Sequence, residues 1–173
     1  LRHDNPRAFE LAATATHLWI SHFHGDHFHV PTLKTLLEIN PEITVYGNRS
    51  YNFQLDEAMR GIGFKNVIPF LERQIVPLAD DVEIVRFPTT GIDNMLLIRS
   101  PYGTILNYND CNVPPQTRKM LGKKFGDIDI FLTNFNHAGK LLIHPFPDGT
   151  EIVGRVQKAF QKNCSSFAPA YIF

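Results

Sequence analysis

Alternating apolar and polar positions predict alternating strands and helices over the first part of the chain. Residues 16–21 (THLWIS) form an apolar run typical of a buried strand. Residues 31–39 (PTLKTLLEI) repeat leucine at helical spacing, and their proline suits a first helical turn. We further expect a strand over residues 43–46, a second helix over 55–60 that Gly61 stops, and a strand over 66–70.

The middle of the chain changes to a succession of short strands. These are expected over residues 74–76, 82–87, 95–99 and 104–108, with a tight turn at Pro101-Tyr102-Gly103, and they predict an antiparallel meander. A helix over 115–124, a strand over 128–133, a helix over 152–162 and a terminal strand over 167–173 complete the pattern. The order predicts an α+β fold, with two mixed sheets packed together, helices outside, and a single domain without a linker.

Composition narrows the classes of function. The 173 residues are 43% hydrophobic and 20% charged, which is ordinary for one globular domain. A net charge of zero gives no diffuse field for nucleic acid or anionic lipid, so neither nucleic-acid nor membrane binding is predicted. Cys111 and Cys164 form no paired motif, which favours a reducing, cytoplasmic location. Because the chain starts at Leu1 and stops within an apolar run, we expect a domain incomplete at both ends.

Candidate chemistry gathers in residues 21–29 (SHFHGDHFH), directly after the first strand. In an extended segment, His22 and His24 share a face and can converge on one ion. After a turn through Gly25, Asp26 and His27 would point away, towards a second ion or position. Imidazole and carboxylate suit zinc, iron or manganese, so the motif HxHxDH predicts a metal site. His29 continues the alternation, and we expect it to face solvent or to support a ligand.

The stretch HFHGDH resembles the signature of the metallo-β-lactamase superfamily, whose αββα four-layer sandwich holds one or two metals at the edge of its sheets. The resemblance implies that Asp110, in TILNYNDC, bridges the metals; taken alone, Asp110 equally fits a turn or helix cap. The family's third histidine for the first metal is missing from residues 87–94 (FPTTGIDN), where Asp93 is the strongest ligand type. The family's last histidine would follow Phe173, and His137, in TNFNHAGK, is the alternative ligand or a loop residue lining the cleft.

The segments THLWISHFHGDHF, ILNYNDC, DIDIFLTNFNHA and PAYIF resemble one branch of this superfamily. That branch includes the metallo-β-lactamase-like domain of CMP-N-acetylneuraminate hydroxylase and the sugar-phosphate lactonases. In the hydroxylase, a Rieske iron–sulfur domain accompanies this domain. The present sequence contains no Rieske Cys/His pairs, so an electron-transfer partner would lie on another part or another chain.

Three functions follow from these residues. The leading hypothesis is a metal-dependent hydrolase with one or two zinc ions, or alternatively iron or manganese. Bound metal lowers the pKa of water from about 16 towards 7, giving a hydroxide that attacks an ester, lactone, amide or phosphodiester of a small-molecule substrate. Asp26 or Asp110 would receive the proton, and the candidate donors to the developing oxyanion are Asn109, Asn134, Asn136 and His137.

The second hypothesis is an iron-dependent oxygenase-type domain that receives electrons from a Rieske-like partner, which the missing histidine and the branch resemblance favour. The third is a degenerate, non-catalytic member that serves as a binding module. The oligomeric state does not follow from the sequence.

Overall fold

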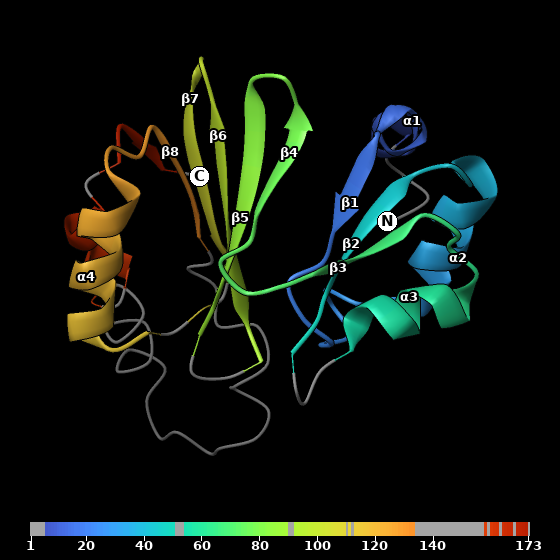
Figure 1. The fold of residues 1–173 in the computed structure, drawn as a ribbon, viewed down its shortest axis with the longest axis horizontal. Coiled ribbons are helices and arrows are strands. Elements are labelled where there is room, and N and C mark those ends of the chain that lie inside the picture. The colour runs from blue at the N-terminus through green and yellow to red at the C-terminus, as the bar shows by residue number, and fades with distance from the viewer. Residues whose placement is uncertain are drawn as a thin grey trace. The chain divides into compact units, whose positions relative to one another are not determined.

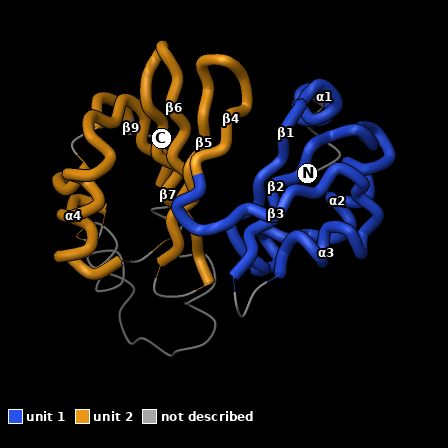
Figure 2. Tube along the Cα trace, in the orientation of Figure 1, with its two compact units in different colours: residues 1–74 blue, residues 75–173 orange. Residues whose placement is uncertain are grey.

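The computed structural model describes residues 6–50, 54–89, 92–109, 111, 113–133, 158, 160–162, 164–167 and 169–172. The chain divides into two compact units, residues 1–74 and 75–173 (Figure 2). Asp110, His137, Asn134 and Asn136 lie outside the described residues, and the single domain stays a prediction. None of the described helices is long and apolar enough to cross a bilayer.

The first unit is a parallel sheet with helical connections (Figure 1). Its elements are α1 (Pro6–Thr14), β1 (His17–Trp19), α2 (Val30–Ile39), β2 (Thr44–Asn48), α3 (Leu55–Ile62) and β3 (Val67–Phe70). The strands pair in the order β1-β2-β3, and both pairs are parallel. The sequence predicted a mixed sheet here, and that prediction was wrong: the sheet is parallel throughout, because a helix connects each strand to the next. The helix α1 was not predicted.

Apolar side chains of α2 and α3 bury one side of this sheet. Together with strand and loop residues they form one buried apolar cluster: Ile20, Leu33, Leu36, Ile43, Val45, Leu55, Met59, Phe64 and Val67. The predicted helix end at Gly61 was wrong, since α3 continues to Ile62. Gly63 follows with a φ of 121°, which places the glycine best suited to ending the helix two positions later.

The second unit is a six-stranded sheet with the order β4-β5-β6-β7-β8-β9. Its elements are β4 (Ile75–Ala79), β5 (Val82–Pro88), β6 (Asn94–Ser100), β7 (Gly103–Asn109), α4 (Pro115–Phe125), β8 (Ile130–Thr133) and β9 (Tyr171–Ile172). The predicted meander is confirmed, because β4 to β7 pair antiparallel. The last two pairs, β7·β8 and β8·β9, are parallel. Residues 164–167 are helical, so the terminal strand is shorter than predicted.

Aromatic residues dominate the core of this second unit. The rings of Phe87 and Phe125 lie 4.6 Å apart, and Phe167 packs 5.3 Å from Phe131 and 5.7 Å from Tyr108. Each buried phenylalanine of this kind contributes about 1.5–3 kcal/mol of hydrophobic stabilisation. Cys111 lies in the same buried cluster.

Candidate metal centre

The histidine motif begins where β1 ends, beside the end of the neighbouring parallel strand β2. Asn48, the last residue of β2, is 4% exposed and holds the chain at this point. Its Nδ2 donates to the carbonyl oxygens of Ile20 at 3.0 Å and of Ser21 at 2.7 Å. Its Oδ1 accepts a hydrogen bond from Trp19 Nε1 at 2.9 Å. A single buried amide therefore fixes three consecutive residues that lead into His22.

The ring nitrogens of His22 and His24 converge, as expected from their spacing. His22 Nε2 lies 2.7 Å from His24 Nδ1, and the rings meet edge to face with centroids 4.4 Å apart. His22 is 2% exposed, whereas His24 is exposed. The pair therefore joins a buried ring to a solvent-exposed one.

A backbone turn follows, and it places His27 differently from the expectation. The amides of His27 and Phe28 both donate to the His24 carbonyl, at 2.9 and 2.7 Å. His27 therefore does not point away. Its ring centroid lies 4.2 Å from that of His22, because the turn brings the chain back. Gly25 adopts no left-handed conformation, and a Cβ there would meet nothing within 4 Å, so the turn does not depend on glycine.

Asp26 and His27 supply a second pair of donor atoms. Asp26 Oδ2 lies 3.7 Å from His27 Nε2, with the Asp26 side chain 77% exposed and that of His27 25% exposed. The Asp26 carboxylate is therefore accessible from solvent. The arrangement suits either a second pair of metal ligands or a base beside the metal.

Ser21 contacts one histidine of each pair, His22 of the first and His27 of the second. Its buried Oγ lies 2.8 Å from His22 Nδ1 and 3.1 Å from His27 Nδ1. No role was predicted for Ser21 or Asn48. The position of Ser21 next to the motif is a usable signal, whereas Asn48 is 27 residues from Ser21 and has none.

The donor atoms fit a transition-metal ion. Two nitrogens at about 2.0–2.1 Å from one tetrahedral zinc lie about 3.3 Å apart. The nitrogens of His22 and His24 are 2.7 Å apart, which is hydrogen-bond distance, so binding one ion requires the two nitrogens to separate. His24 is the exposed ring of the pair. His29 takes no part in this cluster; it is exposed and its Nδ1 lies 2.8 Å from Thr32 Oγ1. The sequence predicted that His29 faces solvent or supports a ligand, and its exposed position agrees with this.

In the second unit, the residues next to both predicted carboxylates meet at one end of the sheet. Asp93 immediately precedes β6, and Asn109, which precedes Asp110, ends β7. Asn109 Nδ2 donates to the Asn94 carbonyl at 3.3 Å. Asn109 has a φ of 55° beside an irregular register, a left-handed conformation that asparagine tolerates better than most residues. Burial raises the pKa of the neighbouring Tyr108 to about 12, so its phenol is neutral at neutral pH without metal.

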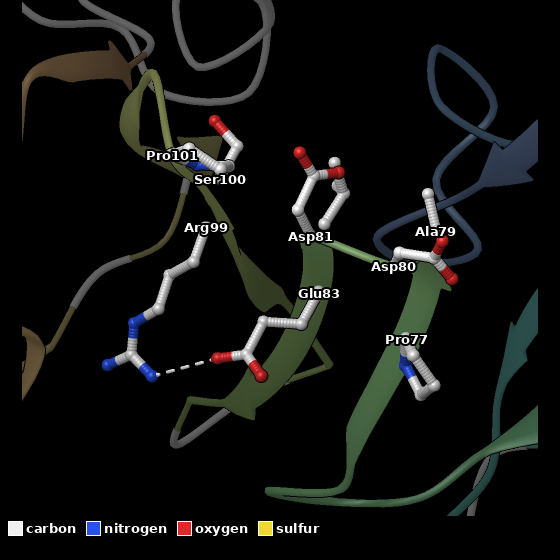
Figure 3. Close-up of a pocket in the computed structure, with 9 residues that line it drawn as sticks. Pro77, Ala79, Asp80, Asp81, Glu83, Arg99, Ser100 and Pro101 are labelled. Atoms are coloured by element: carbon white, nitrogen blue, oxygen red, sulfur yellow. Dashed lines mark hydrogen bonds and ion pairs between the residues drawn. The ribbon is translucent and has the colours of Figure 1, made fainter.

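A separate hollow of about 370 Å³ lies at the other end of these strands (Figure 3). It is lined by the β4–β5 and β6–β7 turns, with Asp80, Asp81 and Glu83 among its side chains. Glu83 accepts an ion-paired hydrogen bond from Arg99 at 3.2 Å. Its charged side chains are three carboxylates and Arg99, and it lies away from the strand ends that lead to Asp93 and Asn109. No part of the candidate metal centre is placed there.

Comparison with known proteins agrees with this architecture. No protein-family profile matches the sequence. Cytidine monophosphate-N-acetylneuraminic acid hydroxylase from Danio rerio is 30% identical over 143 residues, which are 78% of this chain and 23% of the relative. The metallo-beta-lactamase fold protein YhfI from Bacillus subtilis has a TM-score of 0.58 at 14% identity, covering 94% of this chain and 75% of YhfI. The chain has a metallo-β-lactamase fold.

The diiron beta-hydroxylase CmlA from Streptomyces venezuelae shares the metallo-β-lactamase fold of this chain, with a TM-score of 0.67 at 18% identity. The match covers 90% of this chain and 34% of CmlA. The chain thus spans about a quarter of its curated relative and a third of CmlA. These findings support a metal-dependent function on the metallo-β-lactamase fold, and they are compatible with both hydrolysis and hydroxylation.

Proposed function

We propose that this chain carries the metal centre of an iron-dependent hydroxylase, rather than the hydrolase that the sequence alone favours. One observation carries the metal site: the ring nitrogens of His22 and His24 converge at 2.7 Å. The choice of reaction is supported by the hydroxylases among the relatives and solved structures compared above. The fold by itself does not select between reactions.

The proposed ligand set suits iron as well as zinc, and the hydroxylases among the compared proteins favour iron. We propose Asp93 in place of the missing third histidine, and Asp110 as the bridging carboxylate, on the strength of their sequence positions. Two histidines and one carboxylate are the ligand set of many non-haem iron oxygenases. Asp26, with its exposed carboxylate, would accept or return a proton at the reacting group.

When bound, iron would supply the activation of dioxygen. Hydroxylation converts a C–H group to C–OH, and the second oxygen atom leaves as water. That balance requires two electrons and two protons in addition to dioxygen. We therefore propose an electron-transfer partner, as well as a small-molecule substrate, for the active protein.

Metal analysis and oxygen uptake test this proposal. The chain, purified without chelator, should bind iron, and its ferrous form should consume dioxygen when a reductant is supplied. His24→Ala should lose most of the bound iron, since it removes a converging nitrogen. His29→Ala is the matched control, because His29 is an exposed histidine outside the cluster. Iron content unchanged in His24→Ala, or no oxygen uptake by iron-loaded protein, contradicts the proposal.

The two carboxylates have their own control. Asp93→Ala and Asp110→Ala should each reduce retained iron, whereas Asp127→Ala, at an exposed aspartate of the same unit, should not. Equal iron content in all three variants would remove Asp93 and Asp110 from the ligand set.

A zinc hydrolase is the second candidate, because three imidazoles lie together in residues 22–27 and nitrogen ligands suit zinc. It predicts zinc as the metal retained during purification. It also predicts turnover of a nitrophenyl ester that Asp26→Asn reduces, with no oxygen uptake by the same preparation.

A further inference from the structure

The Ser21 hydroxyl contacts two histidines of the motif at the same type of atom. Its Oγ lies 2.8 Å from Nδ1 of His22 and 3.1 Å from Nδ1 of His27. Ser21 and His22 are both buried, at 3% and 2% exposure. Water therefore competes little for these two contacts, and the hydroxyl acts on both rings from the protein side.

The single proton of a hydroxyl limits how these contacts can be made. A serine Oγ can donate one hydrogen bond and can accept two. If it donates to one Nδ1, that ring, when neutral, carries its proton on Nε2 and cannot offer Nε2 to a metal. If it accepts from both rings, each Nδ1 carries the proton and each Nε2 keeps its lone pair.

The second arrangement, in which Ser21 accepts from both rings, agrees with what lies next to Nε2 of each ring. His22 Nε2 faces His24 Nδ1 at 2.7 Å, and His27 Nε2 faces Asp26 Oδ2 at 3.7 Å. These are the two donor pairs of the candidate metal centre. The hydrogen bond that one ring nitrogen makes fixes the role of the other.

We propose that Ser21 is a positioning residue whose hydroxyl accepts hydrogen bonds from Nδ1–H of both His22 and His27, and so presents Nε2 of both rings to metal. This inference rests on the proposed metal function and adds a shared determinant of its two donor pairs. Without the hydroxyl, neither ring is held in the Nδ1–H form, and both are less well oriented.

Zinc titration against a chromophoric chelator measures the effect on the full chain. Ser21→Ala should weaken zinc binding by about 10- to 100-fold, the usual effect of removing a partner of a ligating histidine. Ser21→Thr, which keeps the hydroxyl, should stay within about threefold of the unaltered chain. Thr16→Ala is the matched control: Thr16 Oγ1 lies 2.8 Å from Nδ1 of His17, outside the motif, and its loss should leave zinc affinity unchanged.

Nitrogen NMR of histidine-labelled protein reads the tautomers directly, without metal. With both rings neutral, His22 and His27 should carry the proton on Nδ1 in the unaltered chain and in Ser21→Thr. Both should lose this preference in Ser21→Ala. A proton on Nε2 of either ring in the unaltered, metal-free protein overturns the inference.

The two readouts separate the proposals. Zinc affinity equal in Ser21→Ala and the unaltered chain also overturns the role of Ser21. Failure of the unaltered chain to bind zinc or iron overturns the proposed metal function, while the tautomers still decide whether Ser21 fixes the two rings.

Discussion

Replacing Asn48 by alanine tests whether one buried amide holds the entrance to the motif. The substitution removes three hydrogen bonds, two to the backbone of Ile20 and Ser21 and one from Trp19. Each bond contributes about 1 kcal/mol net, and its loss leaves a buried group without that partner. We expect the free energy of unfolding to fall by about 3 kcal/mol.

Urea unfolding followed by tryptophan fluorescence measures the change in unfolding free energy at the mutated site, because Trp19, a partner of Asn48, is the sole tryptophan of the chain. With a slope of about 2 kcal/mol per molar urea, the midpoint should fall by about 1.5 M. The indole environment should also change in the folded state, since Trp19 Nε1 loses its acceptor.

Asn66→Ala provides the control in the same unit. Asn66 also donates a side-chain hydrogen bond to a backbone carbonyl, that of Glu42 at 3.0 Å, but at an exposed site. Its loss should cost less than about 1 kcal/mol. If the midpoints of the two variants differ by less than about 0.3 M, a clamp by Asn48 is refuted.

Three further predictions concern backbone and charge. Gly47→Ala should destabilise the chain by about 3 kcal/mol or more, because the added Cβ would overlap Asp56 Cα; thermal unfolding checks this, and a near-native midpoint contradicts it. Burial alone would raise the pKa of Asp56, but hydrogen bonds from Arg49 and Arg60 outweigh it and lower the pKa below 3.8. This stabilisation is therefore present above pH 3.8 and lost as pH falls through the lowered pKa, so Asp56→Asn should cost about 2 kcal/mol at pH 7 and progressively less in acid; a pH-independent difference would be inconsistent with the ion pair. Asn109→Val should be about 2 kcal/mol less stable than Asn109→Gly, since its φ is 55°, and equal denaturant midpoints for the two would argue against a left-handed Asn109.

Periodicity predicted most elements because their patterns are local. The meander from β4 to β7 followed from alternating strands and a Pro-Tyr-Gly turn, and the helices α2 and α4 followed from leucine spacing and proline. Helix ends were less predictable: Gly61 and Gly63 both suit a helix end, and packing of Ile62 against the core decided between them. The pairing direction of the first sheet depended on which strands become neighbours, which no local pattern contains.

The candidate site was predictable in its ligand types and less so in its orientation. The spacing of His22 and His24 correctly indicated that the two rings converge. The position of His27 depended on a turn made by backbone amides, which a period of two residues does not anticipate. Asn48 was missed because its role exists only when β1 and β2 lie side by side. For Asp110 and His137, the roles stay predictions.

The short span of the histidine cluster has a consequence for how it assembles. Ser21 and His27 are separated by six positions, and the turn between His24 and Phe28 already brings their side chains together. Closing so small a loop sacrifices little chain entropy, and the cost grows only slowly with length. Once β1 has paired with β2, this half of the centre can form early in folding, before any residue after position 74 has found its place.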